Sequence, residues 1–248
     1  MSGHSKWATI KHKKGAADKA RGKLFAKLAR QIEVAARLGG GDIDSNATLR
    51  TQVLKAKAAQ MTKDAIDRAI KRGTGETGAA NYESITYEAY APGGVAMLIE
   101  VLTDNRNRTA SDVRSIFTKL GGAMAEPGAV GWQFSRRGVV LVGGETDEDT
   151  VVSAALEAGA DDEERDGTSW RVLTDPSQVY DVKDALERSG VSVLSAESTM
   201  VSSTTIEVSD RDDARSILRI MDALDDNDDV QDVYANFDIS ESLMEEVG

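Results

Sequence analysis

The chain has 248 residues, a net charge of −12 and no cysteine. A chain of this length is expected to form two or three domains, because one domain usually contains about 100–200 residues. The lack of cysteine excludes disulfides, thiolate metal sites and cysteine nucleophiles. No apolar run approaches the ~20 residues of a membrane-spanning helix, and Met1–Lys6 has no signal-peptide pattern. We therefore expect a cytoplasmic protein without a membrane partner.

The charge is distributed unevenly along the chain. Residues 1–80 contain 17 basic and 7 acidic side chains, a net charge of +10, whereas residues 81–248 have a net charge of −22. Such an asymmetry is typical of proteins in which one part binds a polyanion and another part stays solvated or faces proteins. The alternative is that the helices of the first segment simply favour lysine and arginine.

The first 80 residues predict a basic arm followed by a three-helix bundle. The arm, residues 1–15, has no acidic residue and is expected to be flexible. Asp44 or Ser45 is expected to cap the second helix and Thr62 the third. Glycine ends the first and third helices, in agreement with helix stop signals. The helices are expected at approximately 16–38, 45–60 and 63–72.

One side of the first predicted helix carries a row of cations. At 100° per residue, Leu24, Leu28 and Ile32 share the face that would pack into the bundle. An adjoining row, less than a quarter-turn wide, contains Arg37 and the four cations that we call the basic stripe: Lys19, Lys23, Lys27 and Arg30. We expect the basic stripe to be rigid, exposed to solvent and available to phosphates.

The apolar pattern changes after residue 80 to mixed strands and helices. Two strands joined by the turn Ala91–Gly94 predict a hairpin. The predicted strands are 85–90, 95–102, 132–134, 139–142, 169–173, 191–195, 204–208 and 230–236, and the predicted helices are 110–120, 148–158, 177–189 and 212–224. The predicted fold class is multidomain α and α+β, with the three-helix bundle (1–80) followed by two α+β sandwich domains. We expect residues 135–200 to be inserted into a discontinuous domain of 81–134 and 201–248.

Two motifs match the residue pattern of a ligand-binding site but lack the sequence context that such a site requires. Gly73-x-Gly75-x-x-Gly78 lacks the leading strand and following helix of a dinucleotide site. Asp225-x-Asn227-x-Asp229 begins like a calcium loop but lacks its glycine and its bidentate glutamate, so we expect a solvated acidic loop. Both histidines lie in the arm, where they make a poor metal site. We expect no metal, no cofactor and no enzymatic activity.

The arm combines cations with an aromatic side chain. Cations neutralise phosphates, and the Trp7 indole can stack on a base. Alternatively, Trp7 and Ile10 fix the arm to the bundle. Two further cations, Lys71 and Arg72, lie in the last turn of the third helix.

A second candidate contact lies between a predicted strand and helix. Asn107 or Thr109 can cap that helix, and Arg106 and Arg108 beside its free N–H groups would suit a phosphate. The alternative is a capped turn with Arg–Asp pairs. The complete set of candidate nucleic-acid-binding residues is Lys6, Trp7, Lys11, Lys13, Lys14, Lys19, Lys23, Lys27, Arg30, Lys71, Arg72, Arg106 and Arg108.

Several runs of residues, spread over nearly the whole chain, resemble the YebC/PmpR family. They are Gly3–Trp7, Ile10–Lys13, Arg21–Phe25, Gly39–Asp42, Lys63–Glu76, Tyr90–Val95, Leu102–Thr109 and Asp228–Asp238. The resemblance implies one helical and two α+β domains. It also implies a DNA-binding transcriptional regulator, although relatives include a mitochondrial translational activator and bacterial proteins linked to ribosomes stalled on proline-rich sequences. Residues 126–134, with Trp132, depart from the family's usual turn.

Two functions therefore compete. The first is a transcriptional regulator that binds DNA, although the first two predicted helices are separated by more than the 3–4 residues of a helix-turn-helix. The second is a ribosome-associated translation factor that binds ribosomal RNA, which the basic, tryptophan-bearing arm suits at least as well. An enzyme is the third class, and no set of catalytic residues supports it.

Overall fold

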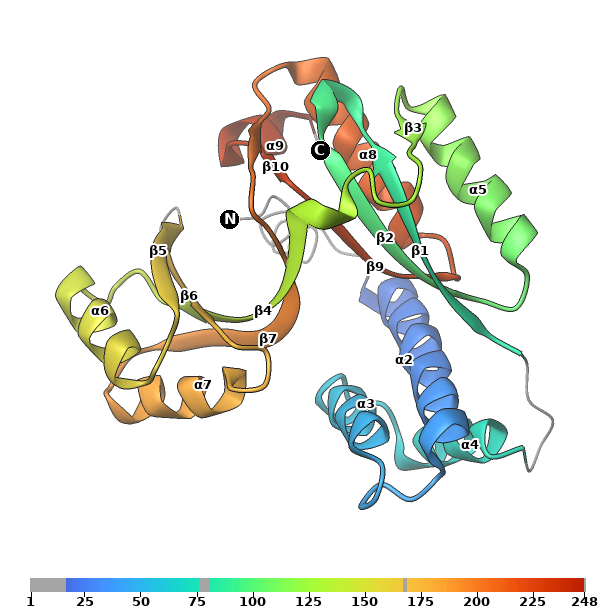
Figure 1. Ribbon diagram of the computed structural model, residues 1–248, viewed down its shortest axis with the longest axis horizontal. Helices are drawn as coiled ribbons and strands as arrows, with labels where there is room; N and C mark the ends of the chain where they lie inside the picture. Colours follow the sequence, from blue (N-terminus) through green and yellow to red (C-terminus); the bar gives the residue numbers. More distant parts are fainter. Residues whose placement is uncertain (1–16, 76–80, 167–168, 248) are drawn as a thin grey trace.

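The computed structural model describes residues 17–75, 81–166 and 169–247 (Figure 1). These residues form a helical unit and two units built on four-stranded sheets, and each has its own apolar core. The arm with its lysines and Trp7 lies outside the described residues, and so does the side chain of Lys19.

The helical unit consists of three helices around a small aliphatic core. Ile32, Leu49 and Ala69 are fully buried at its centre. Thr62 caps the third helix as predicted, because its side chain accepts the N–H of Ala65. The first helix ends at the predicted glycines. The three helices are α2 (Ala17–Gly39), α3 (Ala47–Ala58) and α4 (Lys63–Gly73).

The N-cap of α3 corrects a prediction. The cap is Asn46, not Asp44 or Ser45, and it accepts the N–H three residues further on at 3.0 Å. Its buried amide also donates to the carbonyls of Ala35 and Gly40, at 2.9 and 2.8 Å. An amide has one acceptor oxygen and two N–H donors, whereas a carboxylate has no donor and a hydroxyl has one, so only asparagine can make all three of these bonds here.

The first sheet is antiparallel and is completed by a strand from the end of the chain. The predicted hairpin is present, with a 3₁₀ turn at Pro92–Gly94. The far strand pairs with the hairpin although it lies near the C-terminus. In spatial order, the strands are β3 (Ala123–Met124), β1 (Glu83–Tyr90), β2 (Ala96–Thr103) and β9 (Val230–Ala235).

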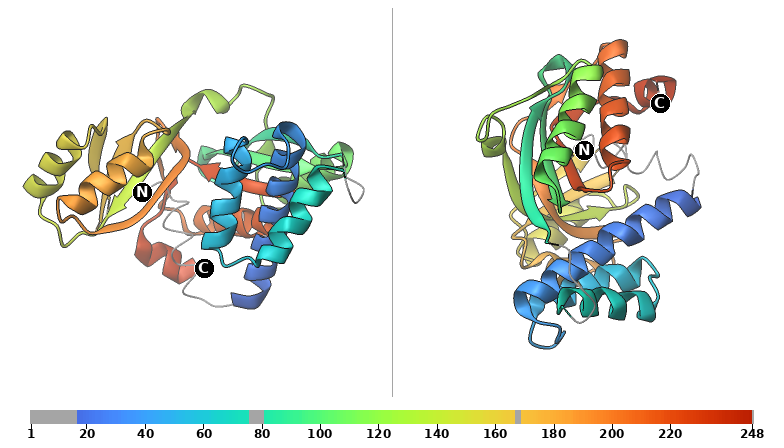
Figure 2. Two further views of the ribbon diagram at one scale, coloured as in Figure 1. Left: turned by 90° about the horizontal axis from the view of Figure 1, so that it is seen from below. Right: turned by 90° about the vertical axis from the view of Figure 1, so that its right-hand side faces the viewer.

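Two long helices lie side by side across one face of this sheet (Figure 2). They are α5 (Arg106–Lys119) and α8 (Arg211–Asp225), and Phe117 and Ile217 are fully buried beneath them. Val130 and Phe134 cover the other face of the sheet, where they pack on Leu98 of β2. Since both faces are covered, β2 is a nearly continuous apolar run rather than an alternating one.

The second sheet has the ferredoxin-like order β-α-β-β-α-β. Its strands, in spatial order, are β5 (Asp162–Asp166), β6 (Ser169–Thr174), β4 (Phe134–Val142) and β7 (Val193–Ser202). Two helices, α6 (Glu148–Glu157) and α7 (Val179–Arg188), bury Val151 and Leu186 against one face of it. Strand β5 was not predicted, because it is a short edge strand made of charged residues.

The predicted strand at 132–134 is wrong. A 3₁₀ turn occupies Gly131–Gln133, and β4 begins only at Phe134. The remaining elements are β8 (Ile206–Glu207), β10 (Phe237–Asp238) and α9 (Glu241–Val247). The arrangement confirms the predicted fold class, multidomain α and α+β. No helix in the described part of the chain is both long and apolar enough to cross a membrane.

Candidate nucleic-acid interface

The basic stripe of α2 lies against an acidic turn from the far end of the chain. The N-terminal half of α2 reaches the first sheet at the last residue of α8 and the connection that follows it to β9, residues 225–229, which we call the acidic turn (Figure 1). Lys23 Nζ is 2.5 Å from Asp226 Oδ1, and Lys27 Nζ is 3.5 Å from Asp225 Oδ1. These pairs place carboxylates where the sequence predicts phosphates.

Arg30 forms the innermost contact between the stripe and the acidic turn. Its Nη1 donates to Asp229 Oδ1 at 3.0 Å and to the carbonyls of Leu102 and Asp228 at 2.9 and 2.7 Å. The guanidinium carbon also lies 5.0 Å from the centre of the Tyr82 ring, which adds a cation–π contact. Arg30 therefore joins the helical unit to the first sheet.

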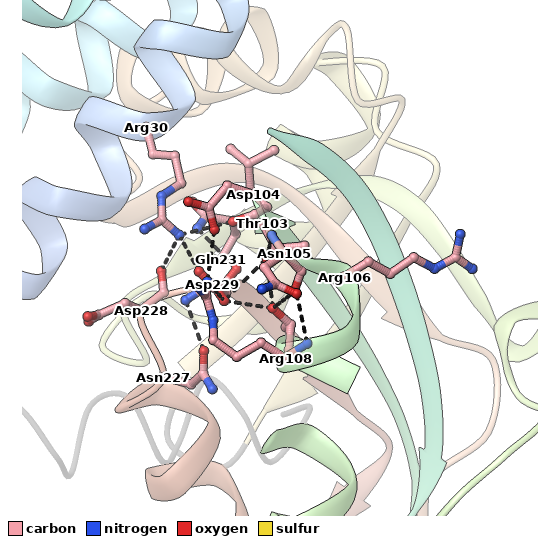
Figure 3. A network of polar contacts seen from close by, with 12 residues as sticks. Arg30, Thr103, Asp104, Asn105, Arg106, Arg108, Asn227, Asp228, Asp229 and Gln231 are labelled. Atoms are coloured by element: carbon pink, nitrogen blue, oxygen red, sulfur yellow. Dashed lines mark hydrogen bonds and ion pairs between the residues drawn. The ribbon is translucent and has the colours of Figure 1, made fainter. Parts of the chain in front are cut away.

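Asp229 is the centre of this network (Figure 3). Its side chain is 8% exposed. Besides Arg30, it accepts from Thr109 Oγ1 at 2.6 Å, Arg108 Nη2 at 2.9 Å and Thr103 Oγ1 at 3.3 Å. Burial alone would raise the pKa of Asp229. The hydrogen bonds from Thr109 and Arg108 and the two guanidinium charges outweigh it, so the pKa lies below its usual value.

The start of α5 brings Thr109 and Arg108 together, and its N-cap differs from the predicted one. Asn105, not Asn107 or Thr109, caps α5 and accepts the N–H of Arg108. The helix therefore begins at Arg106, two or more residues earlier than expected. Its first turn then aims Thr109 and Arg108 at Asp229.

The two arginines of this turn have different surroundings. Arg108 pairs with Asp104 and Asp229, both at 2.9 Å, so it takes the Arg–Asp alternative rather than standing free for a phosphate. Arg106 is exposed and points away from the network (Figure 3).

Two expectations about charge are therefore wrong. The basic stripe is not open to solvent at Lys23, Lys27 and Arg30, whose side chains are 26%, 14% and 18% exposed. The acidic turn is not wholly solvated, because Asp229 is buried. Both expectations fail for the same physical reason: the cations of the basic stripe and the carboxylates of the acidic turn neutralise each other. No local pattern in either segment indicates this pairing, because the two segments are about 200 residues apart in sequence.

Other cations of the helical unit remain exposed. Arg72 is bound to buried Glu33 at 3.0 Å, whereas Lys71 beside it forms no ion pair with a described residue. Four more cations, which the sequence reasoning missed, resemble Lys71. We call these five the outer cations; they are exposed, and none forms an ion pair with any residue in the described ranges: Lys55, Lys57, Lys63, Arg68 and Lys71.

The connection between α3 and α4 is also short. Only residues 59–62 separate the two helices, and Gln60 in this turn has a left-handed φ of 63°. Met61 is buried beneath the turn. A turn of 3–4 residues between two helices is typical of helix-turn-helix units. The longer connection between α2 and α3, which argued against a helix-turn-helix, is therefore not the relevant one.

Within the described ranges, no three histidine, aspartate or glutamate side chains are placed to hold a metal ion. The contacts of this surface are ion pairs, hydrogen bonds and solvated cations.

Comparisons with known proteins agree along the whole chain. The model of the TACO1/YebC protein N-terminal domain matches residues 5–76, and the model of the TACO1/YebC second and third domain matches residues 82–237. A protein of Rubrobacter xylanophilus named "Probable transcriptional regulatory protein" is 57% identical, covering 100% of this chain and 99% of its own. One of Geobacter sp. with the same designation is 53% identical, covering 100% of both chains.

A solved structure has the same fold. The crystal structure of a conserved hypothetical protein from Aquifex aeolicus is 42% identical and has a TM-score of 0.76, covering 90% of this chain and 93% of that one. Two family models together match most of the chain, and full-length relatives exceed half identity. The chain belongs to the TACO1/YebC family.

Proposed function

We propose that this protein is a cytoplasmic, nucleic-acid-binding regulator of gene expression, and that it contacts DNA through α3 and α4 as a transcriptional regulator. The observation that carries the proposal is the set of outer cations, which are exposed and have no ion-pair partner in the described part of the chain. The short α3–α4 turn and the names of the relatives support the same function.

The outer cations differ from the basic stripe in what binding requires. A phosphate that approaches Lys57 or Lys63 meets a solvated ammonium group, whereas one that approaches Lys23 must first displace a carboxylate. Cations that neutralise phosphates release counterions from the nucleic acid, which provides most of the sequence-independent affinity. The outer cations are therefore the first contact, and the acidic units stay away from the phosphates because they carry the excess negative charge.

The proposal is tested by removing three of the outer cations from the full-length protein. Lys57, Lys63 and Lys71 are changed together to glutamine, which preserves helix propensity. A matched control changes three exposed cations of α5 and α8 that also lack an ion-pair partner among the described residues: Arg114, Lys119 and Arg219. Binding to a duplex DNA and to an RNA of the same length is measured over a range of salt concentrations.

We expect the outer variant to lose affinity and salt dependence together. If each cation meets one phosphate, the slope of log K against log salt on duplex DNA flattens by roughly 2–3 units, and affinity falls by at least about tenfold near 0.1 M salt. The control should change by less than about twofold. Equal behaviour of the two variants would overturn the assignment to α3 and α4.

The RNA measurement separates the two functions that the sequence left open. Tighter binding to duplex DNA agrees with transcriptional regulation. Tighter binding to RNA, with the same loss in the outer variant, would replace it with the RNA-binding translation factor. The positive face of the molecule would be the same in both, because phosphates are common to both ligands.

A further inference from the structure

The acidic turn occupies the basic stripe in the manner of a bound polyanion. Each of the three stripe cations whose side chain the structure describes has a carboxylate partner in the turn: Asp226 for Lys23, Asp225 for Lys27 and Asp229 for Arg30. The partners of the first pair are 203 residues apart in sequence. Three ion pairs between segments so far apart in sequence are not expected of two surfaces that are merely solvated.

The acids also stand in a place that is unfavourable for their own helix. Asp225 is the last residue of α8 and Asp226 is its C-cap, and the last turn of α8 contains no basic residue. The negative end of the helix dipole repels carboxylates there. The helix itself gains nothing from these charges, whereas Lys23 and Lys27 of α2 provide counter-charges for them.

The contact has a weak end and a strong end. The two ends differ in their acids: Asp225 and Asp226 are 53% and 67% exposed, although Lys27 and Lys23 are only 14% and 26% exposed, and an ion pair with one exposed partner contributes little to stability. Arg30 and Asp229 are mostly buried and share several further hydrogen bonds. The lysine end can therefore open while the arginine end keeps the units together.

We propose that the acidic turn, through Asp225 and Asp226, is an intramolecular competitor that occupies Lys23 and Lys27 and must leave before a polyanion binds the basic stripe. The inference rests on the proposed function, because nucleic acid is the polyanion that the family's regulators would meet. The protein thus has two states: one in which the acidic turn covers Lys23 and Lys27, and one in which these lysines are available together with the outer cations.

This competition has a signature in salt dependence. When a phosphate displaces Asp226 from Lys23, the nucleic acid releases a counterion, but the freed carboxylate attracts a cation in turn. Displacement therefore makes a smaller contribution to the salt slope than binding to a free lysine. Removing the carboxylate charges should tighten binding and steepen the slope together.

The test uses the full-length protein with Asp225→Asn and Asp226→Asn combined, which keeps side-chain size and leaves Asp229 in place. The control carries Asp112→Asn and Glu157→Gln, two exposed acids on α5 and α6 that form no ion pair with any described residue. Both variants change the net charge equally. The probes are a random-sequence DNA duplex of about 20 base pairs and a heparin column.

We expect the turn variant to bind the duplex about three- to tenfold more tightly than the control near 0.1 M salt, with a slope steeper by about 1–2 units. It should also elute from heparin at a higher salt concentration than the control. Equal shifts in the two variants would overturn the inference, because net charge alone would then explain them.

The heparin measurement keeps the two proposals distinct. One outcome is that the wild type, the turn variant and the control all fail to bind DNA or RNA while the turn variant still elutes from heparin at higher salt than the control. In that case the competition stands and the nucleic-acid function fails. If DNA is bound but the turn variant and the control elute together and bind alike, the function stands and the acidic turn serves only to hold the units together.

Discussion

Replacing Asp229 with asparagine should weaken the junction between the helical unit and the first sheet. The change removes the charge that faces both Arg30 and Arg108 and leaves a neutral amide, 8% exposed at this position, among four donors. The amide oxygen can still accept hydrogen bonds, but the amide nitrogen that replaces the second carboxylate oxygen cannot accept from the donors that face it. The neighbouring Asp228→Asn is a matched control, because the Asp228 side chain is exposed and only its backbone carbonyl binds Arg30.

The magnitude follows from the burial of the partners. Hydrogen bonds to charged groups contribute about 1.5–3 kcal/mol each, and breaking a fully buried pair costs about 3–5 kcal/mol. Arg108 is half exposed and Arg30 keeps two carbonyl acceptors, so part of the loss is recovered. We expect Asp229→Asn to lower the unfolding free energy of the junction by about 2–4 kcal/mol, and Asp228→Asn to change it by less than about 0.5 kcal/mol.

Urea denaturation followed by circular dichroism, with amide hydrogen exchange of α2 as the local probe, measures the effect. The pH dependence of the unfolding free energy is a second test, because its direction follows from the pKa of Asp229. Because the pKa of Asp229 is lowered in the folded state, its contribution is complete above the unfolded pKa and is lost as pH falls through the folded pKa. The gap between wild type and Asp229→Asn should therefore close below about pH 4. Equal denaturation of the two variants at pH 7 would refute the role assigned to Asp229.

Three further changes test other parts of the fold. Burial raises the pKa of Glu88, but the N–H donors of residues 128–131 outweigh burial and lower it overall. Glu88→Gln should therefore speed amide hydrogen exchange in that loop at pH 7. In the wild type, this loss of protection should appear only as pH falls through the pKa of Glu88 in the folded protein. Gly73→Ala should lower the melting temperature by several degrees, because the new Cβ would lie 2.3 Å from the Glu33 carbonyl oxygen. Gly22→Ala meets nothing within 4 Å and should raise it, by up to about 1 kcal/mol in stability; unchanged melting in both glycine variants would contradict the packing described.

Local patterns predicted the elements that are governed by local chemistry. The Thr62 cap and the β1–β2 hairpin follow from residue types at short spacing, and the structure confirms both. Strand β5 was missed because its residues are charged and its place at the edge of the sheet is decided by pairing with β6. The cap of α3 was misplaced because Asn46 also binds the carbonyls of Ala35 and Gly40, outside its own turn. The cap of α5 was misplaced because several residues of that turn can cap a helix, and Asn105 takes the place.

The candidate site was predicted only in part, for a similar reason. Helical periodicity correctly placed Lys23, Lys27 and Arg30 in one row, but no local pattern reports that Asp225–Asp229 lies opposite. Such a pairing is a property of the assembled units. Lys71 was predicted, but the other four outer cations were missed because they do not form a row in sequence, and their availability depends on which other cations are paired.

Photo-cross-linking of the full-length protein most directly tests the claim that α3 and α4 carry the nucleic-acid contact. A duplex DNA and a matched RNA, each carrying a photoreactive base, are cross-linked to the protein, and the modified peptides are mapped by mass spectrometry. We predict cross-links within residues 47–73, which contain the outer cations. Cross-links confined to the second sheet, residues 134–202, with none in the helical unit, would contradict the account.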